Sequence, residues 1–201
     1  MKPILFNLPV PITTPRLLIR PPAIGDGTLL NAAVLESFEM LKIYMPWAKE
    51  KPTLDDSEEV IRREAANWIL KKKEDPELML LILDKKTNDL IGATGFHAID
   101  WDVPSVETGY WIRNQYAGFG LMTEAINAIT QYAFKVLKVK RIAITCDVDN
   151  IRSKKIPERL GYCLEGTLKF HRIKPMTNEA SDTLVYARYD LSGLSDLQVT
   201  W

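Results

Sequence analysis

The chain has few of the residues on which several classes of protein depend. Its 201 residues include two cysteines, Cys146 and Cys163, which lack the paired spacing of a metal site, and a chain of this length needs no disulfide to fold. Its 26 Lys+Arg and 26 Asp+Glu residues cancel, which argues against nucleic acid or an anionic membrane as the main partner. The apolar N-terminal run is interrupted by Pro9 and Pro11, well short of a spanning helix or a signal segment. We therefore expect a cytoplasmic protein with reduced thiols, no metal and no membrane anchor.

Length and composition favour one domain. With 46% hydrophobic residues, the chain has enough apolar surface for a sizeable core, and no internal repeat or low-complexity linker divides it. We therefore predict a single domain spanning residues 1–201. The sequence leaves open whether this domain is a monomer or a homodimer, and its tail, residues 191–201, is a candidate for packing on a partner subunit.

Hydrophobic periodicity predicts an α/β fold. Alternating or β-rich runs indicate seven strands, at about 16–21, 78–83, 90–99, 106–112, 142–148, 162–171 and 182–190. Helical patterns cover about 26–44, 54–73, 122–137 and 150–161. The second helix begins with Thr53 and Asp56 in capping-box spacing and ends in a lysine run, residues 71–73, which we interpret as a solvated helix end. Antiparallel strands followed by a β-α-β unit predict a mixed, mainly antiparallel seven-stranded sheet flanked by helices.

The most informative segment is a glycine-punctuated turn between a strand and an amphipathic helix. Gly118 and Gly120 lack side chains, so successive backbone N–H groups can converge there, and the following helix directs its unpaired N–H groups to the same point. This arrangement suits a phosphate, although the glycines could also serve only to relieve backbone strain. The chain lacks a Walker loop, and Thr123 occupies the place of the third glycine of a dinucleotide fingerprint.

The pattern Gln115-x-x-Gly118-x-Gly120 resembles the acetyl-CoA pyrophosphate loop of the GCN5-related N-acetyltransferases (GNAT). Further motifs in the same order extend the resemblance to the ribosomal-protein N-terminal acetyltransferase branch (RimJ/RimL type). They are found at residues 14–20, 45–47, 92–100, 150–153, 156–162, 165–166 and 182–186. The resemblance therefore covers nearly the whole chain, and it implies the GNAT acyl-CoA acyltransferase fold with acetyl-CoA as co-substrate.

The resemblance also implies where acetyl-CoA binds. Pantetheine is expected to add like an extra strand to the fourth predicted strand, along the backbone of Trp111, Ile112 and Arg113. Asn150 and Ser153 are expected at the pantetheine and sulfur end, although Asn150 could equally be a simple helix cap. The residues expected around the pyrophosphate are Gln115, Tyr116, Ala117, Gly118, Phe119, Gly120, Met122 and Thr123.

The catalytic groups are harder to assign from sequence. Many members of the superfamily carry a tyrosine seven residues after the asparagine as the acid for the departing thiolate, and this chain has Pro157 there. Proline cannot donate to the carbonyl four residues earlier, so we expect the carbonyl of Ser153 to be free. We expect the Ser153 hydroxyl to anchor or protonate the thiolate in place of the missing tyrosine. Glu107 is the candidate base, with His97 and His171 as alternatives.

The function implied is transfer of an acetyl group from acetyl-CoA to a primary amine by direct attack in a ternary complex. The branch resemblance favours the α-amine of a protein or peptide. A small-molecule amine as acceptor, or a non-catalytic module that binds CoA or another protein on the same fold, are the alternatives. The residues that could line the acceptor cleft are Trp47, Phe96, His97, Trp101 and His171.

Overall fold

The computed structural model describes residues 2–71 and 76–201. Its centre is one sheet with the strand order β1-β2-β3-β4-β5-β6-β8-β7, in which β5 and β6 are parallel and the other neighbours antiparallel. The strands are β1 (Ile12–Thr13), β2 (Leu17–Arg20), β3 (Leu78–Asp84), β4 (Leu90–Asp100), β5 (Ser105–Ile112), β6 (Arg141–Asp147), β7 (Cys163–Ile173) and β8 (Ala180–Arg188).

The sheet therefore has eight strands and not the predicted seven. The additional strand is β1, and its two residues are too few to show an alternating pattern in the sequence. It forms because the chain turns back antiparallel onto β2, with Ile12 opposite Ile19. The mixed, mainly antiparallel arrangement itself is confirmed.

In the described residues, four α-helices flank the sheet: α1 (Gly27–Tyr44), α2 (Leu54–Leu70), α3 (Leu121–Tyr132) and α4 (Ile151–Arg159). Three short helical turns accompany them, η1 (Pro3–Leu5), η2 (Asn114–Tyr116) and η3 (Ala133–Leu137), the last of which extends α3. The predicted capping box is present, since Thr53 and Asp56 exchange hydrogen bonds at the start of α2. The helix ends at Leu70, with Lys71 in a left-handed conformation. The rest of the lysine run, residues 72–73, lies outside the described residues.

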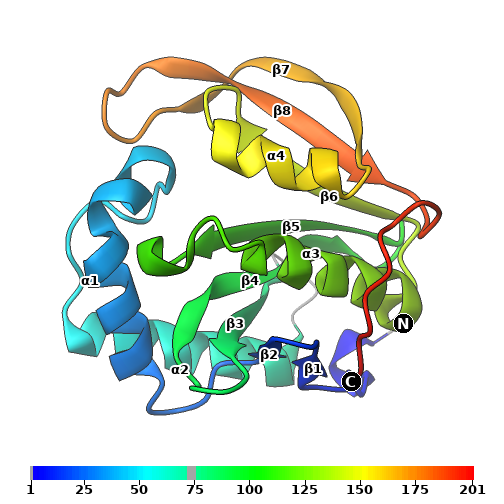
Figure 1. Cartoon of the computed structure of the whole chain (residues 1–201), viewed down its shortest axis with the longest axis horizontal. Helices are drawn as coiled ribbons and strands as arrows, with labels where there is room; N and C mark the ends of the chain where they lie inside the picture. The colour runs from blue at the N-terminus through cyan, green and yellow to red at the C-terminus, as the bar shows by residue number, and fades with distance from the viewer. Residues whose placement is uncertain (1, 72–75) are drawn as a thin grey trace.

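The helices form two layers, one on each face of the sheet (Figure 1). One layer is α1 and α2, whose apolar side chains pack with Leu81, Ala93 and Trp111 of the sheet. The other is α3 and α4, which pack with the opposite side chains of the same strands. Residues on successive positions of a strand point to opposite faces, so β3, β4 and β5 contribute side chains to both layers.

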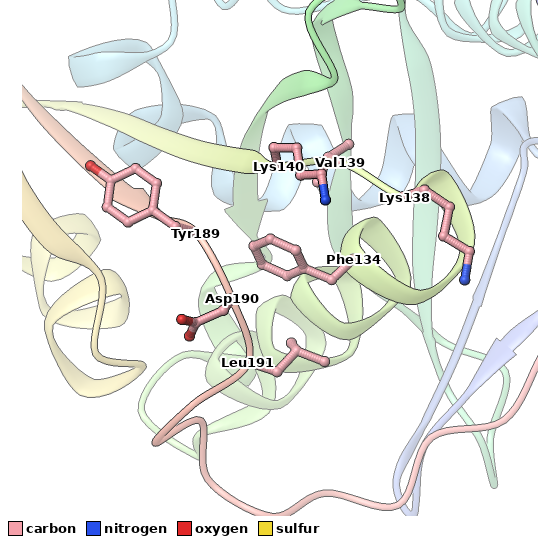
Figure 2. Close-up of a pocket in the computed structure, with 7 residues that line it drawn as sticks. All are labelled: Phe134, Lys138, Val139, Lys140, Tyr189, Asp190 and Leu191. Atoms are coloured by element: carbon pink, nitrogen blue, oxygen red, sulfur yellow. The ribbon is translucent and has the colours of Figure 1, made fainter.

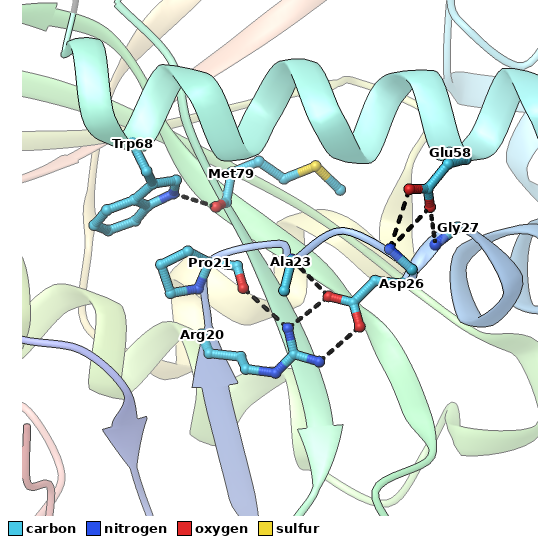
Figure 3. Close-up of polar contacts among 9 residues, drawn as sticks. Arg20, Pro21, Ala23, Asp26, Gly27, Glu58, Trp68 and Met79 are labelled. Carbon is cyan, nitrogen blue, oxygen red and sulfur yellow. Dashed lines mark hydrogen bonds and ion pairs between the residues drawn. The ribbon is translucent and has the colours of Figure 1, made fainter.

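Polar contacts join α1 to α2 and to the end of β2 (Figure 3). The Arg20 guanidinium donates to both carboxylate oxygens of Asp26, at 2.6 and 2.8 Å. The Glu58 carboxylate of α2 accepts from the amides of Gly25 and Gly27 at the start of α1. A Cβ on Gly27 would lie 2.7 Å from the Cα of Glu58, so only glycine allows this approach. These contacts hold α1 and α2 together. The two helices form the wall that covers one face of the sheet.

The tail packs on its own chain (Figure 1). That it also packs on a partner subunit stays a prediction. Thr200 exchanges two backbone hydrogen bonds with Thr13 of β1, at 2.7 and 3.0 Å. The buried Asn127 of α3 donates to the carbonyl of Ser195 at 2.8 Å. The Trp201 ring meets a buried aromatic ring of α3 edge-on. The tail therefore covers α3 and pairs with the edge of the sheet.

Deleting residues 194–201 should lower the free energy of unfolding by at least about 2 kcal/mol. The deletion removes several hydrogen bonds, each worth about 1 kcal/mol, and leaves the buried NH2 group of Asn127 without its acceptors on Ser195. Urea denaturation followed by circular dichroism measures the change. Gln198→Ala is the matched control, since its side chain is exposed and should change stability by no more than about 0.5 kcal/mol. An unaltered unfolding midpoint in the deleted chain would contradict the role of the tail.

Candidate active site

The sheet opens between β5 and β6. The two strands pair in parallel at Ser105, Val106 and Glu107, and within the described residues their pairing ends there. Beyond Glu107, β5 continues to Ile112 with its pairing to β4 intact. The far half of β5 therefore has one paired edge and one open edge.

The hydrogen-bonding register decides which backbone groups face the opening. The Arg113 amide donates to the Ile91 carbonyl at 2.7 Å, so this pair is hydrogen-bonded across the antiparallel ladder. Because such pairs alternate, the backbone groups of Trp111 also face β4, whereas those of Tyr110 and Ile112 face the opening. Of the three residues predicted to bind pantetheine through the backbone, Ile112 alone presents its groups to the opening. Tyr110 was missed in that prediction.

The glycine turn has the backbone conformation that the sequence predicted. We call the turn and the first amides of α3, residues 118–123, the cradle. Gly118 and Gly120 have φ values of 90° and 76°, in the region that favours glycine. Gly120 immediately precedes α3, and the first helical hydrogen bond runs from the Glu124 amide to the Gly120 carbonyl. The amides of residues 121–123 are thus free of helical partners. A Cβ on Gly118 would meet nothing within 4 Å, so the space in front of the cradle is open.

Side chains from two distant segments hold the cradle in place. Arg16 donates to the Phe119 carbonyl at 3.0 Å and is itself paired with Glu124 of α3 at 2.5 Å. On the other side, Arg113 pairs with Glu36 of α1 at 2.5 Å. The loop is therefore fixed before any ligand binds, which lowers the entropy cost of binding.

A cavity of about 820 Å³ lies between the sheet and the wall made by α1 and α2. Its lining comes from α1, the 45–52 loop, α2, β3, β4 and β5, and includes Trp47 and His97 as predicted. Phe96 borders the cavity, but its ring is fully buried and stacks on Tyr132, so it is a core group. His171 lies on β7 and contacts Thr183 instead. The contribution of α2 was not predicted, because no local pattern indicates which helix faces an opening.

Glu107 and His97 meet at the edge of this cavity. They are directly opposite each other on β5 and β4, and His97 Nε2 lies 3.7 Å from Glu107 Oε2. The contact with His97 is the main cause that lowers the pKa of Glu107; burial opposes it, and the positive charge of Arg141 assists. A Cβ on Gly109 would lie 3.3 Å from His97 Cε1, so the ring lies close to the β5 backbone. Glu107, the candidate base, and His97, its first alternative, therefore form one pair.

Ser153 occupies the first turn of α4, on the other side of the opening. Asn150 caps the helix, as predicted, by accepting from the Ser153 amide at 3.1 Å. The Ser153 carbonyl is not free as expected, because the Tyr110 hydroxyl donates to it at 2.9 Å. Cys146 is buried nearby, and burial raises the pKa of its thiol to about 11.

A second hollow of about 350 Å³ lies where the start of the tail passes η3 (Figure 2). Phe134, Lys140 and Leu191 are among its lining residues, and none of the predicted site residues borders it. No group of three or more His, Cys, Asp or Glu side chains arranged for a metal occurs in residues 2–71 and 76–201. In the same part of the chain, no helix is long and apolar enough to cross a bilayer.

Comparison with known proteins identifies the family. The Acetyltransferase (GNAT) domain family matches residues 16–162. The ribosomal-protein-serine acetyltransferase of Escherichia coli (strain K12) is 27% identical over 147 residues, which are 73% of this chain and 80% of that protein. YdaF of Bacillus subtilis (strain 168) is 38% identical over 77 residues, 38% of this chain and 42% of YdaF, so the match spans less than half of that relative.

A solved structure shares the fold along most of the chain. The microcin C7 self-immunity acetyltransferase MccE, in complex with acetyl-CoA and AMP, superposes with a TM-score of 0.77 at 26% identity, covering 88% of this chain and 93% of MccE. The open edge of β5 and the amide cradle before α3 fit acetyl-CoA, which needs an extended groove for pantetheine and amide donors for its pyrophosphate. The chain belongs to the GNAT acetyltransferase family, and its relatives include ribosomal-protein acetyltransferases.

Proposed function

We propose that this acetyltransferase moves an acetyl group from acetyl-CoA to the α-amine of a protein or peptide. The observation that carries the proposal is the position of the open β5 edge. The amide cradle lies at one end of this edge, and the His97–Glu107 pair and the cavity of about 820 Å³ lie at the other. A donor held along β5 would therefore present its thioester to an amine in the cavity.

In this proposal the amides of residues 118–123 bind the pyrophosphate, with the side chains of Gln115 to Thr123 around them. The backbone of Tyr110 and Ile112 binds pantetheine, and the Asn150 side chain lies near its sulfur end. Orientation supplies most of the rate, because effective molarities of well-oriented groups reach about 10⁵ M or more. The cradle and strand edge are fixed by ion pairs and sheet hydrogen bonds, as such orientation requires.

The chemical step needs one proton acceptor and one group for the leaving sulfur. The amine nitrogen bonds to the acetyl carbon, the C–S bond breaks, and the proton released from nitrogen passes to the His97–Glu107 pair. Glu107 remains a carboxylate at neutral pH, because its pKa is lowered, and is therefore available to accept the proton. The thiolate accepts a hydrogen bond from the Ser153 hydroxyl and takes its proton from water after release.

Several features support an α-amine as the acceptor. An α-amine has a pKa of about 7.7–8.0 against about 10.4 for lysine, so it is far easier to deprotonate. The cavity mouth is open, with Trp47 52% exposed, which leaves room for a chain that continues outward. The relative from Escherichia coli is named for a ribosomal protein, which is an acceptor of this class.

Matched peptides test the proposal. A peptide with a free N-terminus and one lysine should be acetylated at least about tenfold faster than the same peptide with a blocked N-terminus, because its α-amine carries more of the neutral form at pH 7.5. Thiol release gives the rate, and mass spectrometry of the product gives the modified nitrogen. Equal or faster reaction of the blocked peptide would overturn the α-amine preference, and turnover with small amines alone would move the proposal to a small-molecule acceptor.

A further inference from the structure

Pro157 alters the hydrogen bonding within α4. In an α-helix the amide of residue 157 donates to the carbonyl of Ser153, and proline has no amide hydrogen. The structure supplies another donor, since the Tyr110 hydroxyl of β5 lies 2.9 Å from the Ser153 carbonyl oxygen. A side chain from the sheet thus takes the place of a backbone donor of the helix.

The same hydroxyl also contacts the Ser153 side chain. Tyr110 Oη and Ser153 Oγ are 3.3 Å apart. The single hydroxyl hydrogen of Tyr110 is used by the carbonyl, so its oxygen must accept in this second contact and Ser153 must donate. At 3.3 Å the bond is longer than the usual O–H···O distance of about 2.7–2.8 Å and therefore weak. The Ser153 hydrogen can move to a stronger acceptor at small cost.

A leaving thiolate is such an acceptor, because hydrogen bonds to a charged group are roughly twice as strong as those between neutral groups. Tyr110 itself is unsuited to giving up a proton. Burial raises the pKa of Tyr110 far above the usual tyrosine value, and the hydrogen bond with Ser153 opposes this only in part. Its hydroxyl therefore keeps its hydrogen, and its bond to the Ser153 carbonyl persists at any working pH.

From this geometry we infer that Tyr110 is a positioning residue, whose hydroxyl replaces the amide that Pro157 lacks and so directs the Ser153 hydroxyl toward the leaving sulfur. The inference rests on the proposed function. As the C–N bond forms and the C–S bond breaks, the Ser153 hydrogen bond shifts from Tyr110 Oη to sulfur, and no covalent bond of Ser153 or Tyr110 breaks. Many members of the superfamily instead carry a tyrosine on the helix itself, at the position of Pro157.

A double-mutant cycle in kcat tests the positioning role. Tyr110→Phe keeps the ring and should lower kcat about tenfold, which corresponds to about 1.4 kcal/mol, while KM for acetyl-CoA stays nearly unchanged. Ser153→Ala should give a similar loss. The double variant should be no slower than Ser153→Ala alone, because Tyr110 acts through Ser153. Multiplied losses in the double variant would overturn the inference.

Thermal unfolding gives a second test that does not depend on turnover. Tyr110→Phe should lower Tm by about 2–4 °C, and by clearly less in a Pro157→Ala background, where alanine restores the amide for the Ser153 carbonyl. Tyr116→Phe is the matched control, since its hydroxyl bonds Asp89 away from α4 and its effect should not depend on residue 157. Equal Tm losses for Tyr110→Phe in both backgrounds would overturn the inference. Absence of turnover in the wild-type chain would instead contradict the proposed function.

Discussion

Replacing Gly118 by glutamate should weaken acetyl-CoA binding by at least about a hundredfold while the chain stays folded. The new carboxylate would project into the open space before the cradle and face the pyrophosphate. One pair of like charges 4 Å apart costs about 4 kcal/mol near a protein surface, and each 1.4 kcal/mol is about tenfold in affinity. Isothermal titration calorimetry with acetyl-CoA measures the change.

Two variants separate charge from backbone strain. Gly193→Glu places the same side chain at a positive φ of 68°, again with nothing within 4 Å, but in the tail. It should bind acetyl-CoA as the wild type does. Gly118→Ala introduces strain without charge and should cause only a small loss of affinity. A folded Gly118→Glu chain that binds acetyl-CoA normally would show that the pyrophosphate lies elsewhere.

The second large effect is expected from Glu107→Gln. The amide keeps the shape of the side chain but cannot accept the proton released from nitrogen, and loss of general-base catalysis costs about 10²- to 10⁴-fold in rate. We therefore expect kcat to fall at least about a hundredfold at neutral pH, with acetyl-CoA affinity nearly intact. Stopped assays of thiol release give kcat, and calorimetry gives the affinity.

The pH dependence identifies the step that is affected. As the pH rises above about 8, an α-amine is already neutral, so the deficit of Glu107→Gln should shrink. Glu39→Gln on α1 is the matched control, because that carboxylate is exposed, pairs with Lys42 and should leave the rate unchanged. A rate for Glu107→Gln equal to that of the wild type at neutral pH would assign the base to another group. A His97→Gln variant with full activity would show that His97 takes no part in the proton transfer.

The sequence alone predicted the parts of the fold that are set by neighbouring residues. The capping box at Thr53 and the cap at Asn150 depend on hydrogen bonds across three residues, and both are present. The turn at Gly118 and Gly120 depends on backbone conformations that glycine permits, followed by an amphipathic helix. These features are local, so their sequence patterns are sufficient to predict them.

The sequence was less informative where short elements or long-range contacts decide the structure. The two-residue strand β1 has no periodicity, and it exists because the chain folds back on β2 and the tail pairs with it. The tail itself is held by Asn127, a buried polar residue of α3, and the partner of its side chain lies 68 residues away. No local pattern indicates such a partner.

The same division applies to the site. The sequence by itself determined the glycine turn before α3, the family and the set of candidate residues, because these rest on short motifs of neighbouring residues. The tertiary structure alone decided that His97 and Glu107 form a pair, since that contact depends on the register of two strands. It also decided that the Tyr110 hydroxyl supplies the hydrogen-bond donor that Pro157 lacks. The sequence shows that a donor for the Ser153 carbonyl is missing, but not which distant side chain replaces it.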